Sequence, residues 1–260
     1  KGSGDTATSA IWFDIKERVG ATEFLGYAMD EAQGIVTALV KDGKEVRELK
    51  HGETGTLITN QTPFYGESGG QVGDVGIMAN TQFSARITGT SNPLAGLHAH
   101  AIIVDGGVIK IGDAVDMTID WERRARIRAN HSATHLLHAV LRNQLGEHIS
   151  QKGSLVAEDR LRFDITHPKQ ITREELDAIE ASVNLLIWQN SEVATRLMGQ
   201  QEAIKAGAMA LCGEKYGDEV RGLYMGEDDA GGVYSVELCG GTHVTRTGDI
   251  GLFKILSESA

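Results

Sequence analysis

Apolar and polar residues alternate in short runs over the first 119 residues, and glycine or aspartate-glycine pairs interrupt these runs. Alternation with a period of two predicts strands with one buried face. We expect strands at residues 34–40, 46–49, 54–60, 76–79, 83–89, 98–104 and 108–111, and a short helix before them at 11–18. Asp42-Gly43 and Asp105-Gly106-Gly107 have the composition of hairpin turns. Many short strands joined by close turns indicate a small β-barrel or sandwich.

The period of the apolar pattern changes from two to about 3.6 at Asp120. One long helix is predicted from Trp121 to Leu145, with Asp120 as its N-cap and Gly146 just past its end. This change of period marks a domain boundary. We therefore expect a β-barrel domain at residues 1–119 and a second domain at residues 120–260.

The second domain mixes helices with hairpins and has no regular βαβ units. Thr172-Arg173-Glu174-Glu175 has the form of a capping box and precedes a helix with an apolar face. A further helix is expected at 200–205. We expect strands at residues 149–156, 161–165, 192–198, 220–225, 233–238 and 250–255. The combination indicates an α+β domain.

The cysteine count, the apolar runs and the net charge exclude several classes of protein. The 260 residues contain two cysteines, too few for a disulfide framework, so a reducing, cytoplasmic compartment is expected. No signal peptide or long apolar run is present. The chain starts at Lys1 rather than at a methionine, so we expect a piece of a longer protein. The formal net charge of -11 argues against a generally basic surface that coats nucleic acid.

Two separated motifs predict a metal site. His131 and His135 are four residues apart on the long helix, so both imidazoles can face one point. Cys239-Gly240-Gly241-Thr242-His243 adds a thiolate and an imidazole at a flexible turn. A mixed set of imidazoles and a thiolate suits zinc. A metalloprotease helix would have glutamate after the first histidine, and Ser132 stands there instead.

The residues leave several alternatives open. Four protein ligands are typical of a structural zinc, whereas a catalytic zinc keeps one position open. Thr134 and Gln151 are candidate site residues that also fit plain hydrogen bonding. The glycine loop at residues 64–74 is either a bulge or a binding loop. Cys212 has a small apolar setting that favours the core. Four arginines at the head of the long helix form either a basic patch or a solvated face: Arg123, Arg124, Arg126 and Arg128.

These motifs together resemble the editing region of bacterial alanyl-tRNA synthetase, and a related domain occurs in threonyl-tRNA synthetase. The resemblance covers nearly the whole chain in the right order. It rests on Gly69–Gln71, His131–Ala139, Gln151–Val156, Leu161–Asp164 and Cys239–Gly251. No part of the chain resembles a class II aminoacylation core, so the resemblance implies flanking aminoacylation and C-terminal domains in the full-length protein.

The resemblance implies that the protein hydrolyses tRNA(Ala) wrongly charged with serine or glycine. It implies zinc at His131, His135, Cys239 and His243, and roles in the editing pocket for Thr134 and Gln151. Gly69, Gly70 and Gln71 would bind the substrate, and we add Arg128 to that set. The zinc would polarise the carbonyl, activate water or anchor the substrate's amine, and these roles stay open. Two alternatives remain: a freestanding trans-editing deacylase and a non-catalytic, zinc-stabilised tRNA-binding module.

The acidic balance of the chain bears on its tRNA partner. Affinity for nucleic acid depends on cationic contacts with phosphates. We therefore expect this chain to hold tRNA weakly by itself, with flanking domains supplying much of the affinity. Filter binding that shows nanomolar affinity for tRNA(Ala) at physiological salt would contradict this expectation.

Overall fold

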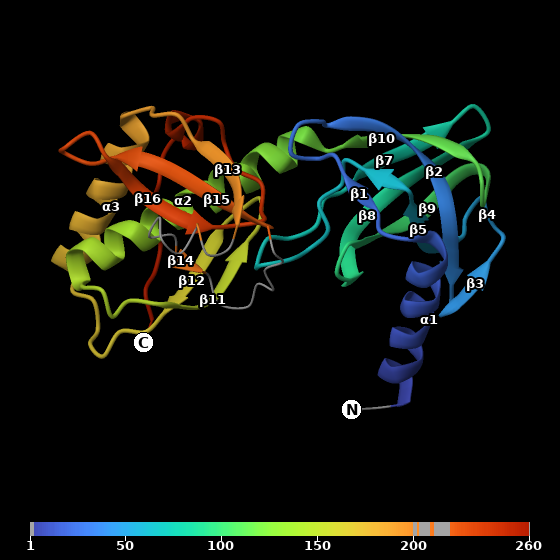
Figure 1. Ribbon diagram of the computed structural model, residues 1–260, viewed down its shortest axis with the longest axis horizontal. Coiled ribbons are helices and arrows are strands. Elements are labelled where there is room, and N and C mark those ends of the chain that lie inside the picture. Colours follow the sequence, from blue (N-terminus) through green and yellow to red (C-terminus); the bar gives the residue numbers. More distant parts are fainter. Residues whose placement is uncertain (1–2, 200–201, 203–208, 211–218, 260) are drawn as a thin grey trace. The chain divides into compact units, whose positions relative to one another are not determined.

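The computed structural model describes residues 3–199, 202, 209–210 and 219–259 (Figure 1). The chain forms two compact units: Lys1–Ser68 with Val72–Arg124, and Gly69–Gln71 with Ala125–Ala260. The division expected after residue 119 differs in two places. The first turn of the long helix groups with the N-terminal unit, and the tip of the glycine loop groups with the C-terminal unit. Within the described ranges, no helix has both the length and the apolar character needed to cross a membrane.

The N-terminal unit contains a closed β-barrel. Its six strands pair antiparallel around a ring in the order β10, β7, β8, β9, β5, β2 and back to β10. They are β2 (Glu31–Lys41), β5 (Thr54–Thr59), β7 (Gly76–Asn80), β8 (Phe83–Leu94), β9 (Leu97–Lys110) and β10 (Ala114–Ile119). Short strands β3 (Lys44–Val46) and β4 (Glu48–Lys50) pair with β2 and β9, and β1 (Glu23–Phe24) pairs with β6 (Gln61–Thr62). The pairing of β10 with β2 closes the ring, which confirms the predicted barrel rather than the sandwich. Strand β10 was not among the predicted strands.

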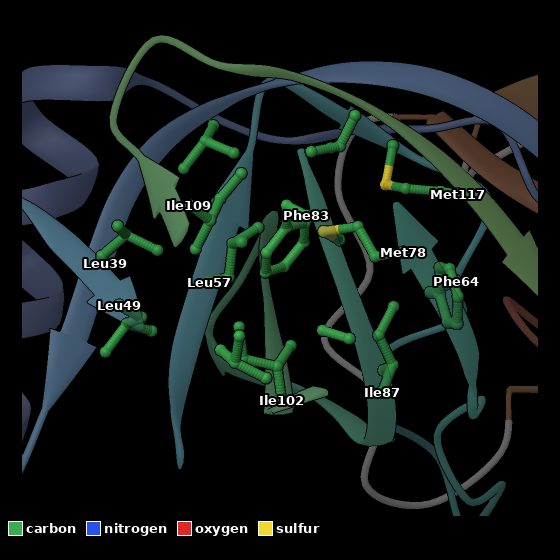
Figure 2. Close-up of a cluster of buried hydrophobic side chains, with 14 of the residues drawn as sticks. Leu39, Leu49, Leu57, Phe64, Met78, Phe83, Ile87, Ile102, Ile109 and Met117 are labelled. Atoms are coloured by element: carbon green, nitrogen blue, oxygen red, sulfur yellow. The ribbon is translucent and has the colours of Figure 1, made fainter. Parts of the chain in front are cut away.

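Alternation along the strands fills the barrel. In β8, Phe83, Ala85 and Ile87 are buried while the residues between them are exposed, as the period of two requires. Figure 2 shows Phe83 and Ile87 in the cluster of aliphatic, aromatic and methionine side chains that forms this core, to which Ala85 also belongs. Helix α1 (Ser3–Val19) is longer than predicted, and its buried Ile15 packs with Ala38 in a second cluster.

One of the two predicted hairpin turns is correct. Asp42 and Gly43 have φ values of 52° and 73° and join β2 to β3, as an Asp-Gly turn should. The prediction at Asp105-Gly106-Gly107 is wrong, because β9 runs straight through it. Pairing with β8 shifts register there, which leaves a β-bulge. Gly107 has a φ of 73°, and a Cβ on it would lie 1.7 Å from the Gln82 carbonyl oxygen.

A buried histidine makes the barrel unit sensitive to acid. His100 Nδ1 donates to the Leu57 carbonyl at 2.8 Å, so Nε2 accepts from the Thr62 hydroxyl at 2.8 Å. Burial lowers the pKa of His100 from 6.5 to about 4. Between these values the unfolded chain binds a proton that the folded chain excludes. Stability from this group is therefore full above pH 6.5 and is lost as the pH falls towards 4.

We predict that replacing His100 with glutamine reduces the acid sensitivity of folding. Each pKa unit corresponds to about 1.4 kcal/mol, so His100 should account for about 2 kcal/mol of the stability lost between pH 7 and pH 5. Urea unfolding at both pH values measures this loss. The exposed His51 provides a matched control, His51→Gln. An equal pH dependence in wild type and His100→Gln would contradict the prediction.

The C-terminal unit is an α+β domain. Most of helix α2 (Trp121–Leu145), the hairpin of β11 (Gln151–Val156) and β12 (Leu161–Ile165), and helix α3 (Arg173–Trp188) contribute to it. A sheet in this unit has the strand order β13 (Ala194–Gly199), β15 (Glu219–Glu227), β16 (Val233–Leu238), β14 (Met209–Ala210). The predicted capping box is confirmed, since Thr172 Oγ1 accepts from the Glu175 N–H and Glu175 accepts from the Thr172 N–H. Leu136, Ile179 and Leu223 lie in one core that joins α2, α3 and the sheet.

The predicted strand at residues 250–255 is wrong. A short 3₁₀-helix, η1 (Thr247–Ile250), is followed by irregular backbone. The Asn184 amide on α3 donates to the Phe253 carbonyl and accepts from its N–H, both at 2.9 Å. A side chain therefore supplies the bonds that a neighbouring strand would have supplied. The predicted helix at 200–205 falls largely on residues outside the described ranges, as does Cys212.

Candidate metal centre

Helix α2 supplies two imidazoles to one point. Asp120 Oδ1 accepts from the Arg123 N–H at 3.0 Å, and Gly146, with a φ of 118°, follows the last residue of the helix, so both predicted ends are confirmed. His131 and His135 are one turn apart, and their ring centroids are 5.1 Å apart. The helix thus fixes the spacing of this pair.

The segment after β16 supplies a thiol and a third imidazole. Cys239 Sγ lies 3.4 Å from His131 Nε2, and His243 Nε2 lies 3.3 Å from His135 Nε2. One donor atom from each of the four residues lies within 4.8 Å of all the others. The structure therefore brings together the four predicted ligands in a group that can hold a metal ion.

Gly241 makes this close approach possible. A Cβ on it would lie 2.1 Å from His131 Cε1 and 2.8 Å from Gln71 Oε1. We predict that Gly241→Ala displaces His131 and weakens metal binding more than about 10-fold, which competition with a chelator measures. The control is Gly199→Ala, where a Cβ meets nothing within 4 Å. Equal affinities in the two variants would contradict the prediction.

Hydrogen bonds hold the outer nitrogens of the α2 histidines. His131 Nδ1 contacts Gln71 Oε1 at 2.7 Å, and His135 Nδ1 contacts a Glu237 oxygen at 2.5 Å. The second Glu237 oxygen contacts His138 Nδ1 at 2.7 Å. Glu237 is not among the predicted site residues. Its position on a strand two residues before Cys239 places both on one face, and this signal could have revealed it.

Electrostatics distinguish the three ligand histidines. Burial lowers the pKa of His131 and His243 well below 6.5, and their imidazole neighbours lower it further; the charges of Arg221 and Arg128 also lower the pKa of His243. Burial opposes the charged form of His135 too, but Glu237 and Cys239 outweigh it and raise the pKa of His135. The raised pKa favours the protonated His135 imidazole, so a metal ion that binds His135 must displace a proton from it.

The two candidate pocket residues, Thr134 and Gln151, are both buried in the C-terminal unit. Thr134 follows His131 by three positions, so it lies one turn along α2, and its hydroxyl donates to the Asn130 carbonyl at 2.8 Å. The hydroxyl oxygen keeps acceptor capacity. Gln151 begins β11 and is 9% exposed, and its buried Oε1 has no hydrogen-bond partner among the described residues.

The glycine loop and the arginines at the head of α2 each have residues in both units. Gly69 and Gly70 have φ values of 57° and 86°, and Gln71 is fully buried in the C-terminal unit. Arg128 is half-buried on α2, three positions before His131. The structure contradicts a surface role for Arg124, which is 1% exposed and paired with Asp74 inside the N-terminal unit.

Comparison with known proteins adds sequence relationships to this geometry. Residues 2–123 match the family described as tRNA synthetases class II (A), and residues 220–260 match the threonyl and alanyl tRNA synthetase second additional domain. The first match is at odds with the expectation that no part of the chain resembles a class II aminoacylation core. The alanine–tRNA ligases of Rhizorhabdus wittichii strain RW1 and Sphingopyxis alaskensis are each 58% identical to the chain, and that of Sinorhizobium medicae is 55% identical. These matches cover 100% of the chain, which spans about 30% of the length of these relatives.

Proposed function

Because the chain belongs to the alanine–tRNA ligase family, we propose that it performs hydrolytic editing of tRNA(Ala) charged with serine or glycine. The ligation of alanine to tRNA(Ala) with ATP is proposed for the full-length enzyme. The observation that carries the editing proposal is the convergence of His131, His135, Cys239 and His243 within 4.8 Å.

We assign zinc to this group on the chemistry and spacing of the donors. Zinc takes nitrogen ligands at about 2.0–2.1 Å and sulfur at about 2.3 Å, so ligand atoms at the corners of a tetrahedron are about 3.3–3.6 Å apart. The distances of 3.3 Å between two imidazole nitrogens and 3.4 Å between nitrogen and sulfur fit this arrangement. A zinc ion held there would polarise the ester carbonyl or anchor the substrate's amine.

The chain's own residues would orient the ester for attack. In hydrolysis the water oxygen bonds to the acyl carbon, and the ribose oxygen leaves and takes up a proton. Gln151 Oε1 offers a buried acceptor for the substrate's ammonium group or serine hydroxyl, and Thr134 offers a second acceptor. Arg128 would contact a phosphate near the 3′ end. An aminoacyl ester is activated, so placement and charge stabilisation suffice.

The acceptors on Gln151 and Thr134 would also discriminate serine from alanine. A synthetic site for alanine rejects the slightly larger serine poorly, and a second hydrolytic site solves that problem. Alanine lacks the hydroxyl that a buried acceptor in the editing pocket would bind. We further propose that residues 120–260 form the editing domain, that flanking aminoacylation and C-terminal domains help to deliver the tRNA, and that the protein acts in the cytoplasm.

Variants of the two pocket residues test whether the protein is an enzyme. We predict that Gln151→Ala and Thr134→Ala each slow seryl-tRNA(Ala) deacylation by about 10- to 100-fold, the value of one hydrogen bond to a charged group. Both variants should keep their zinc and their fold. Gln144→Ala is the control, because Gln144 is exposed and bonded to Ser182. Unchanged rates in both folded, zinc-loaded variants would contradict the assigned roles.

A second candidate function rests on the same ligand set. Four protein ligands leave no open position on a tetrahedral zinc, which is typical of structural sites. A non-catalytic tRNA-binding module would therefore bind zinc and tRNA but release no serine. The deacylation rate of the wild-type protein separates the two candidates.

A further inference from the structure

We infer that Gln71 is a positioning residue of the metal centre: its amide fixes the proton of His131 on Nδ1 and thereby presents Nε2 to the metal. The inference rests on the proposed metal centre. Gln71 is fully buried, and its side chain contacts a metal-ligating histidine and the turn that carries two other ligands. The Gln71 amide therefore lies on the Nδ1 side of His131, and His131 Nε2 faces Cys239 Sγ.

The hydrogen-bond network determines the orientation of the Gln71 amide. The backbone N–H of Thr242 can only donate, and it meets Gln71 Oε1 at 2.9 Å. Gln71 Nε2 in turn donates to the Thr242 hydroxyl oxygen at 2.9 Å. The atom facing Thr242 N–H is therefore the amide oxygen, and no flipped orientation satisfies both contacts.

The tautomer of His131 follows from that orientation. The same Oε1 lies 2.7 Å from His131 Nδ1, and an amide oxygen can only accept, so Nδ1 carries the proton. A neutral imidazole has one N–H, which leaves the lone pair of Nε2 free. That nitrogen is the one directed at Cys239 Sγ. Glu237, on β16, contacts His135 Nδ1 in the same way.

The glycines before Gln71 bring its backbone close enough to β11 to hold the amide in place. The Val156 N–H donates to the Gly70 carbonyl at 2.7 Å, and Gln71 forms a parallel bridge with Val156. A Cβ on Gly70 would lie 2.6 Å from the Ser154 carbonyl oxygen, so only glycine fits there. The Gly69–Gln71 segment thus acts as a support for the metal ligand.

Zinc affinity of paired variants tests the inference. Gln71→Met keeps the approximate volume but removes the acceptor, and groups that orient metal ligands typically contribute 10- to 100-fold in affinity. We expect a loss of that size, measured by competition with a chromogenic chelator. Gln71→Glu should retain near wild-type affinity because a carboxylate still accepts from both N–H groups. Gln144→Met provides the same substitution at an exposed position.

The outcomes separate this inference from the proposed function. Unchanged affinity in folded Gln71→Met, with wild type binding zinc, would overturn the inference alone. Failure of wild type to bind zinc would overturn both. A second measurement needs no variant: long-range proton–nitrogen NMR of the zinc-loaded wild type should show the His131 proton on Nδ1 and zinc on Nε2. The reverse assignment would overturn the inference even if Gln71→Met does not fold.

Discussion

Replacing Cys239 with alanine is expected to abolish deacylation and to weaken zinc binding by more than the roughly 100-fold that a change outside the ligand set costs. Cys239 is the only thiol in the ligand group, is 2% exposed and lies 3.4 Å from His131 Nε2. Without it, three imidazoles remain, and a site made of imidazoles alone is less selective for zinc over other transition metals. Competition with a chelator and the zinc content after dialysis measure the loss.

The control for this experiment is His167→Ala. It removes a half-buried imidazole of the same unit, whose hydrogen-bond partner is the exposed His148, outside the ligand group. Its zinc content and rate should match those of wild type. If Cys239→Ala retained stoichiometric zinc at wild-type affinity, the thiolate would not be a ligand and the assignment of zinc would fail.

Replacing Arg124 with methionine is expected to destabilise the N-terminal unit by about 3–5 kcal/mol, because it leaves a buried carboxylate without its partner. Arg124 and Asp74 are each 1% exposed and form an ion pair. Arg124 also donates to the carbonyls of Gly26 at 2.7 Å and Pro63 at 3.0 Å. Asp74 accepts from the Tyr65 N–H at 2.7 Å, so the pair ties together distant parts of the unit. Urea unfolding measures the change.

Two further variants show whether burial is the cause. Arg86 pairs with Asp105 on the exposed barrel surface, and Arg86→Met should alter the free energy of unfolding far less than Arg124→Met. Replacing Asp74 with leucine in the Arg124→Met background should restore part of the loss, since no unpaired charge remains. Equal effects of Arg124→Met and Arg86→Met would contradict this account.

Local signals in the sequence predicted the elements that carry the ligands. Asp120 and Gly146 delimit α2 because capping and positive φ depend on one residue and its immediate neighbours. The four-residue spacing of His131 and His135 fixes their common face in any α-helix. The motif around Cys239 indicated the other two ligands, and the structure brings all four together.

Features that depend on distant partners escaped prediction. Asp105-Gly106-Gly107 has the composition of a turn, but pairing with β8 makes it a bulge. Residues 250–255 have a strand-like pattern, but Asn184 satisfies the backbone of Phe253. Glu237 was not predicted, and the hydrogen bond of Gln71 to His131 was not; both side chains meet histidines that lie far away in the chain. No local pattern states which remote group a buried polar side chain will meet.

The most direct test of the central claim compares release of serine and of alanine from tRNA(Ala) by the zinc-loaded protein and by the same protein after chelation. The proposed function predicts rapid release of serine, slow release of alanine, and loss of the serine activity on chelation that added zinc restores. A folded, zinc-loaded protein, bound to the tRNA, that releases neither amino acid faster than buffer would contradict the proposal.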